Sequence, residues 1–223
     1  MNMHLNGAVF LLPLLAVLCK GAVMVNLRNE AKEYIDKKNR TGKIDGWGLT
    51  RQYEYWRQTM QAIEGYPISA TVTSLECLPE EANSDGRQVG NMDYKCSEEF
   101  TLFIDEGVYS PFRLYSEVVF PVIGDRPFGF KSFRVVDLNN KTEISETIDT
   151  VPGRPQWRSC RFQAEVTLSG YFAYHLKGEK LEDDEYVPVV VGALANQSRK
   201  LFHRHDRLVF NITGDYTQKV CFY

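Results

Sequence analysis

Up to about residue 65, apolar residues recur at intervals of three and four positions, the spacing of one face of an α-helix. The first run predicts a helix from Asn26 to Lys38, and the Gly-, Asn- and Asp-rich segment Asn39 to Gly48 predicts a turn after it. A second run follows Thr50, a suitable capping residue, and ends before Pro67. Its apolar positions share one face: Tyr53, Trp56, Met60 and Ile63. The pattern therefore predicts two N-terminal helices.

From Tyr66 onward, apolar and polar residues tend to alternate, which is the pattern of a half-buried strand. The clearest run is Arg161 to Leu168, where every even-numbered residue is apolar and every odd-numbered one is polar. Turn residues such as Pro152 to Pro155 separate the runs. The other predicted strands are 68–75, 100–104, 113–122, 128–138, 143–150, 171–176, 187–194, 207–213 and 218–222.

Short strands with frequent turns, and no helical run between them, are typical of an antiparallel sheet. The fold class we expect is α+β, with two N-terminal helices followed by a mainly antiparallel β-sheet that forms a curled barrel or a sandwich. A chain of 223 residues fits one domain. We expect a single secreted globular domain at 22–223, with a helical part at 22–65 and a β part at 66–223.

The first residues indicate the compartment. Gly7 to Leu18 is almost wholly apolar, with about the length of a signal-peptide core and too short to span a bilayer. Cys19 and Gly21 are small residues suited to a cleavage site after Gly21. We therefore expect residues 1–21 to be a signal peptide and the protein to be secreted and extracellular. No later apolar run approaches about 18 residues, so no membrane span is expected in the mature chain.

Cysteine usage agrees with export. The chain has five cysteines, and Cys19 is removed with the signal peptide. The four that remain are Cys77, Cys96, Cys160 and Cys221. An even number in an exported chain predicts disulfides, here two, and four cysteines allow three pairings. We favour Cys77–Cys96, which closes a short loop, and Cys160–Cys221, which holds the C-terminus.

N-glycosylation is also predicted. Four tripeptides fit the N-x-[ST] pattern, and their acceptors are Asn39, Asn140, Asn196 and Asn211. Asn211 falls on the polar side of the predicted strand 207–213, where a glycan has room. We expect at least two of the four to carry sugar.

The formal net charge of −3 excludes a nucleic-acid binder that depends on a strong basic surplus. One basic cluster is present, which we call the basic patch: Arg199, Lys200, His203, Arg204, His205 and Arg207. Such a patch suits a sulfated glycan or an acidic partner, and a solvated loop is the alternative. His203 and His205 share a strand face, but a third metal ligand would have to be His175 or a carboxylate. We therefore predict no metal site.

No catalytic motif is found. The G-x-S-x-G sequence of serine hydrolases is absent, and the even cysteine count leaves no free thiol nucleophile. Paired carboxylates carry no short motif, so a secreted hydrolase with dispersed carboxylates stays open. Neither the G-x-W motif of lipocalins nor the Q-x-V-x-G loop of cystatin-like inhibitors is present, and no family is assigned.

Aromatic residues suggest the function class. They gather at 47–66, 128–133 and 171–174, where they either fill a core or line a ligand cavity. We predict a non-catalytic binding module without a cofactor, which takes a small apolar ligand in a cavity or binds an extracellular protein partner. A structural component of an extracellular matrix, shell or coat is the alternative, but such proteins often show repeats, and the chain has none.

Overall fold

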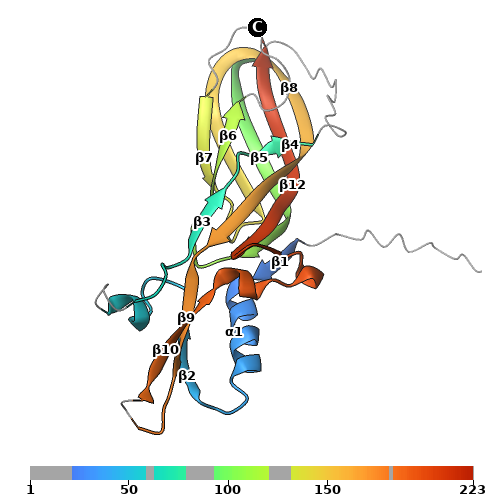
Figure 1. The fold of residues 1–223 in the computed structure, drawn as a ribbon. Helices are drawn as coiled ribbons and strands as arrows, with labels where there is room; N and C mark the ends of the chain where they lie inside the picture. The colour runs from blue at the N-terminus through green and yellow to red at the C-terminus, as the bar shows by residue number, and fades with distance from the viewer. Residues whose placement is uncertain (1–21, 59–62, 79–92, 121–131, 181–182, 223) are drawn as a thin grey trace, which may run out of the picture.

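The computed structural model describes residues 22–58, 63–78, 93–120, 132–180 and 183–222. The molecule is elongated, with long strands at one end and a small sheet beside a helix at the other (Figure 1). The long strands are β5 (Asp93–Tyr109), β8 (Glu143–Ser169) and β12 (Arg207–Phe222). The predicted signal peptide, 1–21, lies outside the described residues.

Strand β8 pairs with both other long strands. Its residues 143–153 pair antiparallel with 93–103 of β5, and its residues 154–168 pair antiparallel with 208–222 of β12. Strands β5 and β12 also pair with each other. The three strands therefore form one curled sheet, in which the two halves of β8 pair with different neighbours and β8 arches over the end where the chain terminates (Figure 1).

The arch replaces a predicted break between two strands. We expected Pro152 to Pro155 to be a turn between separate strands at 143–150 and 161–168. The segment instead stays in the sheet, because Gly153 still pairs with Asp93 while Arg154 already pairs with Phe222. A bent strand keeps its main-chain hydrogen-bonding groups paired across the change of partner.

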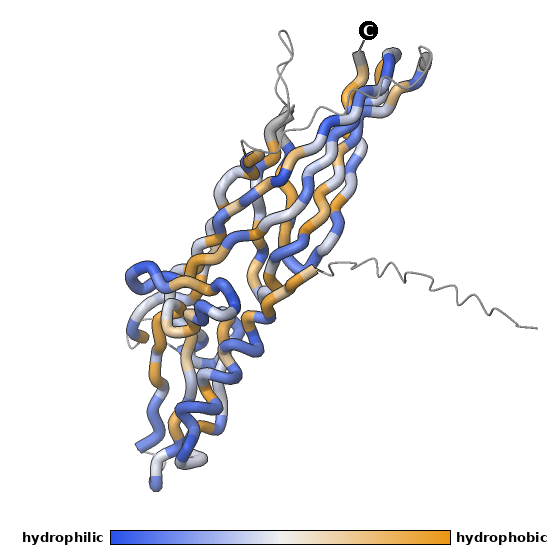
Figure 2. Tube along the Cα trace, turned by 90° about the vertical axis from the view of Figure 1, so that its right-hand side faces the viewer, coloured by the Kyte–Doolittle hydropathy of each residue, from blue (hydrophilic) through white to orange (hydrophobic). Residues whose placement is uncertain are grey.

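The alternation in the sequence correctly predicts the core. Phe162, Ala164, Val166 and Leu168 are fully buried, whereas the polar residues between them are partly exposed. Hydrophobic and hydrophilic residues alternate along the long strands in Figure 2. Burying a large apolar side chain contributes about 1.5–3 kcal/mol, so the inward face supplies much of the stability.

The small sheet has the order β10-β9-β2 and is antiparallel. Its strands are β2 (Ile44–Gly48), β9 (Tyr171–Leu176) and β10 (Glu185–Val190). Helix α1 (Leu27–Lys38) covers one face, where Tyr34 meets Phe172 edge to face at 5.6 Å between ring centroids. The Asn26 side chain caps α1 by accepting from the main-chain N–H groups of Arg28 and Asn29. The first predicted helix is therefore confirmed.

The second predicted helix is wrong. Between Thr50 and Pro67, the described residues form only one 3₁₀ turn, η1 (Glu54–Arg57), and Met60 lies outside the description. Tyr53 packs against β2, where a Cβ added to Gly48 would lie 2.5 Å from the Cβ of Tyr53. The aromatic spacing thus reflects packing against a sheet and not a helical face. Since α1 is the one α-helix of the described residues, the α+β class with two helices is wrong, and the fold is mostly β.

The remaining elements flank these two sheets. Strand β1 pairs parallel with β5, β3 and β4 pair with β8, and β11 pairs with β12. Strands β6 and β7 form a separate pair. The bounds are β1 (Val23–Asn26), β3 (Ser69–Val72), β4 (Glu76–Cys77), β6 (Tyr115–Phe120), β7 (Ser132–Asp137), η5 (Val191–Leu194), η6 (Gln197–Arg199) and β11 (Phe202–Arg204).

Two disulfides are present, as predicted, but the favoured pairing is wrong. Cys77 joins Cys160, and Cys96 joins Cys221. Strand β4 lies beside β8 with Cys77 opposite Phe162, which brings Cys77 near Cys160 on the same strand. Strands β5 and β12 likewise bring Cys96 and Cys221 together. Each disulfide therefore links neighbouring strands that are far apart in sequence, and neither closes a short loop.

Candidate functional site

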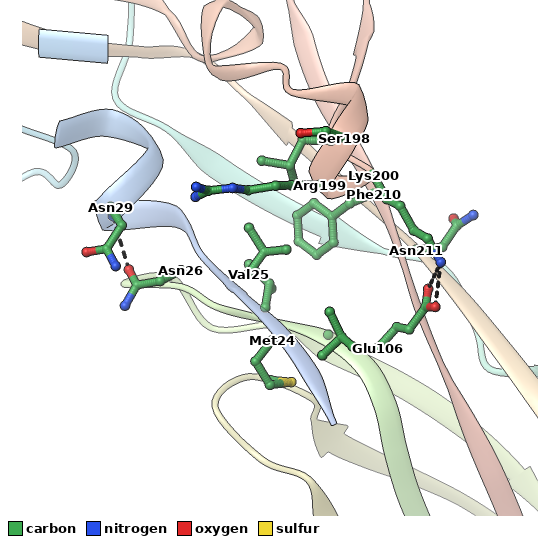
Figure 3. A pocket seen from close by; sticks show the side chains of 14 residues that line it. Met24, Val25, Asn26, Asn29, Glu106, Ser198, Arg199, Lys200, Phe210 and Asn211 are labelled. Atoms are coloured by element: carbon green, nitrogen blue, oxygen red, sulfur yellow. Dashed lines mark hydrogen bonds and ion pairs between the residues drawn. The ribbon is translucent and has the colours of Figure 1, made fainter. Parts of the chain in front are cut away.

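A cavity of about 390 Å³ lies where the long strands meet the helical end of the molecule (Figure 3). Strands β1, β5 and β12 line it together with the chain around η6. Glu106 of β5 marks the junction, because it pairs with Val23 of β1 and with Thr213 of β12. The cavity therefore combines four segments that are distant in sequence.

The floor of the cavity is apolar. Val25, Val108, Leu201 and Phe210 line it, and the last three are almost fully buried. Figure 3 shows the ring of Phe210 and the side chain of Val25 turned toward each other. These side chains present hydrocarbon surface to whatever enters the space.

Gly107 lets β1 lie close to β5 at the base of the cavity. A Cβ added to Gly107 would lie 3.0 Å from the sulfur of Met24 and 3.0 Å from Ile104. Met24 also lines the cavity, and its flexible thioether suits an irregular apolar wall. The absence of a side chain at Gly107 therefore allows β1 to form one wall of the cavity.

The rim carries cations that are already paired. Lys200 Nζ lies 2.6 Å from Glu106 Oε2. Arg199 bonds the buried carboxylate of Glu30 and lies 3.0 Å from Glu33. The Asn196 amide also donates to Glu30, at 3.1 Å. Both cations of the rim are thus paired, and carboxylates outnumber them.

The structure divides the basic patch in two. Arg199 and Lys200 line the cavity, and Arg204 pairs with Glu165 at 3.0 Å. His203 lies against η5, since a Cβ added to Gly192 would meet its ring at 2.6 Å. His205 and Arg207 line a different cavity, near the β11–β12 turn. Binding by the six residues as one surface stays a prediction.

The glycan acceptors differ in their surroundings. Asn140 and Asn211 are exposed, and Asn211 also lines the cavity. The side-chain amide of Asn39 donates to the carbonyl of Ile44 at 3.0 Å, and that of Asn196 donates to Glu30. Glycosylation itself stays a prediction at all four positions.

Aromatic residues pack on both faces of the small sheet. Phe172 of β9 faces α1, and on the opposite face Tyr186 of β10 meets Tyr53 and Tyr55. Burial, with a smaller effect of neighbouring Tyr186 and Asp45, raises the pKa of Tyr53 to about 12. These aromatic residues therefore form part of the packing between the small sheet and its neighbours.

Sequence reasoning missed a polar cluster on the small sheet. His175 Nδ1 lies 2.6 Å from Asp45 Oδ1, and His175 Nε2 lies 3.8 Å from Asp184 Oδ2. The hydrogen bond with His175 holds the pKa of Asp45 below its usual value. The cluster joins β2, β9 and the segment before β10, so it stabilises this sheet.

Within the described ranges, no group of three or more His, Cys, Asp or Glu side chains is arranged to hold a metal ion. His175 lies in the small sheet and is not brought beside His203 and His205. Across the same described ranges, no helix has the length and apolar content needed to cross a membrane.

No protein-family model matches the chain, and no similar sequence is found among characterised proteins. Among solved structures, the chain is similar to the Cry23Aa1 and Cry37Aa1 binary protein complex, at 14% identity over 89% of this chain and 86% of that one, with a TM-score of 0.46. The Mpp75Aa1.1 beta-pore-forming protein from Brevibacillus laterosporus matches at 12% identity over 87% and 84%, with a TM-score of 0.34. A non-toxic crystal protein from Bacillus thuringiensis matches at 11% identity over 89% and 94%, with a TM-score of 0.38.

Proposed function

We propose that the protein is a secreted binding protein that takes a small, neutral, amphipathic ligand in the cavity between β1, β5, β12 and η6. The observation that carries the proposal is the apolar floor beneath a rim of paired charges. The volume of about 390 Å³ falls in the range of roughly 300–1,000 Å³ that ligand sites occupy. Two disulfides support an extracellular location.

The paired rim favours a neutral ligand over a negatively charged one. A negatively charged ligand would have to compete with Glu106 for Lys200 and with Glu30 and Glu33 for Arg199. A hydroxyl or amide group can instead bond Asn26, Asn29 or Ser198 without breaking an ion pair. The apolar part of the ligand would lie against Phe210 and Val25.

Titration with N-phenyl-1-naphthylamine, a neutral apolar fluorophore, tests the proposal on the full secreted chain. Val25→Trp fills the cavity with a larger ring, so we expect saturable fluorescence enhancement with the native protein and little with this variant. Val135→Trp is the matched control, since Val135 is 61% exposed on β7, outside the cavity lining. Circular dichroism and thermal melting of both variants show whether they fold.

Retention of binding in Val135→Trp and its loss in folded Val25→Trp support the proposal. The proposal fails if the native protein gives no saturable enhancement, or if both folded variants bind the fluorophore as the native protein does.

A further inference from the structure

A second cavity, of about 240 Å³, lies at the turn between β11 and β12. Its lining includes Tyr66, Tyr171, His205, Asp206 and Arg207. None of these residues lines the first cavity. A ligand here would therefore bind independently of the function proposed above.

The cavity offers an aromatic surface. Tyr66 meets Tyr171 edge to face, with ring centroids 5.9 Å apart, and Tyr66 is 56% exposed. An exposed tyrosine supplies a flat apolar ring and a hydroxyl on the same side chain. Such a ring suits a ligand with one apolar face and several hydroxyl groups.

Polar groups of both kinds face the same cavity. Arg207 donates hydrogen bonds only, Asp206 accepts them, and His205 does either. Arg207 makes no ion pair with any residue in the described ranges, unlike Arg199, Lys200 and Arg204 of the basic patch. Among the described residues, Arg207 is thus the one arginine or lysine of the basic patch without an ion pair, and it lines the same cavity as the exposed tyrosine.

The turn that presents these groups has an unfavourable backbone. Arg204 pairs with Arg207, so His205 and Asp206 form a two-residue hairpin loop. His205 has a φ of 56°. Glycine is the usual residue at positive φ in such loops. Histidine adopts positive φ more often than most non-glycine residues, but it still lacks the conformational freedom of glycine. The imidazole of His205 is thus presented at the tip of the turn, at a position that glycine would occupy more easily.

We infer that this second cavity binds one sugar ring of an extracellular glycan. Tyr66 packs on the C–H face of the ring, while His205, Asp206 and Arg207 bond its hydroxyl groups or an acidic substituent. The volume lies just below that of drug-sized ligand sites, roughly 300 Å³ at the least, which suits one ring.

The experiment applies the full-length protein, after enzymatic removal of its own N-glycans, to an array of neutral, uronic-acid and sulfated oligosaccharides. We expect binding to at least one of these classes. Tyr66→Ala should reduce it about tenfold, the effect of losing a ring stacked on the ligand. Tyr115→Ala is the matched control, because Tyr115 is 55% exposed on β6 and should leave binding unchanged.

His205→Gly distinguishes a binding role from a structural one. Glycine relieves the backbone strain, so this variant should melt at a higher temperature and yet bind the glycan more weakly. Binding of neutral oligosaccharides and binding of sulfated ones support the inference equally, if the binding depends on Tyr66 and His205. The inference is overturned if no glycan binds, or if binding persists in both Tyr66→Ala and His205→Gly.

Discussion

Lys200 and His205 adopt backbone conformations that most residues avoid, with φ of 57° and 56°. In the described parts of the chain, the other non-glycine residue with positive φ is Asn140, and asparagine tolerates the left-handed region well. Lys200 lines the first cavity and His205 the second. At the scale of single residues, a non-glycine residue with positive φ therefore lines each of the two candidate binding sites.

The strain at Lys200 is measurable with two substitutions. Lys200→Gly and Lys200→Ala both remove the ammonium group that pairs with Glu106. The loss of the ion pair therefore lowers the stability of both variants equally. Only glycine accepts the φ of 57° without a steric penalty. We expect the glycine variant to unfold at a higher urea concentration, with a difference of about 1 kcal/mol in the free energy of unfolding. Equal midpoints would contradict the strain.

Side-chain hydrogen bonds predict which glycan acceptors are occupied. Asn140 and Asn211 are exposed, whereas the amides of Asn39 and Asn196 bond Ile44 and Glu30. A glycan leaves the amide nitrogen one hydrogen, so on either bonded amide it would have to fit beside the partner of that hydrogen bond. For protein expressed through the secretory pathway of a eukaryotic cell, we expect mass spectrometry, after glycosidase treatment in ¹⁸O water, to find the label at Asn140 and Asn211. Labelling confined to Asn39 and Asn196 would refute the prediction.

At the scale of elements, Gly214 lets β12 pass between its two neighbours. It pairs with Ile104 of β5 on one side and with Phe162 of β8 on the other. A Cβ added to Gly214 would lie 1.9 Å from the carbonyl oxygen of Phe103. The close approach involves main chain, which a rotamer change cannot relieve.

Gly214→Ala should therefore destabilise the long-strand sheet by about 1–3 kcal/mol or more. Gly46→Ala is the matched control, because its added Cβ would lie 3.3 Å from the hydroxyl of Tyr53, a flexible side-chain end. Urea unfolding followed by tryptophan fluorescence compares the two. A Gly214→Ala protein as stable as Gly46→Ala would show that β12 can shift away from β5.

An ion-paired cluster also joins the three long strands. Arg161 of β8 lies 2.6 Å from Asp105 of β5 and 3.0 Å from Asp215 of β12. Burial raises the pKa of Asp105, but hydrogen bonds from Arg161 and Thr213 and the charge of Arg161 outweigh it. The pKa of Asp105 therefore lies below its usual value, and its ionised form stabilises the fold.

The sign of the pH effect follows from the lowered pKa. Asp105 contributes fully above its unfolded pKa of about 3.9, and the contribution is lost as the pH falls through the lower folded value. We expect Asp105→Asn to lower the urea midpoint near neutral pH, and the difference from the native protein to shrink at about pH 3. Glu143→Gln, an exposed substitution on β8, controls for general acid effects. A difference that grows on acidification would contradict the role of Asp105.

At the scale of the whole molecule, two disulfides tie the long-strand end together. They span sequence separations of 83 and 125 residues, so each restricts a large part of the unfolded chain. Cys77–Cys160 holds β4 to β8, and Cys96–Cys221 holds β5 to β12.

Replacing Cys96 and Cys221 by alanine should lower the free energy of unfolding by about 2–5 kcal/mol, mainly because the unfolded chain regains entropy. Calorimetry or urea unfolding measures the loss, and the same double replacement of Cys77 and Cys160 should behave alike. Non-reducing peptide mapping of the native protein should yield the pairs Cys77–Cys160 and Cys96–Cys221. A Cys77–Cys96 peptide would contradict the strand arrangement.

Tertiary contacts decided what local spacing could not predict. The interval pattern at Tyr53 and Trp56 suggested a helix, but Tyr53 packs against the small sheet, and Trp56 packs on Tyr55. The cavity residues Met24, Glu106 and Phe210 carry no shared motif, because strand pairing alone brings their segments together. The basic patch was visible in the sequence. Its acidic partners, at positions 30, 33, 106 and 165, could not be identified there, because they are distant from the patch along the chain.

The sequence by itself determined which side chains of the long strands face inward, where α1 begins, and that four cysteines form two disulfides. The first two properties depend on neighbouring residues, and the third depends on the even number of cysteines. The tertiary structure decided which strands pair, which cysteines join and which cations stay unpaired. Those properties depend on how segments up to 169 positions apart lie against each other, and alternation is the same for every register that keeps the apolar face inside.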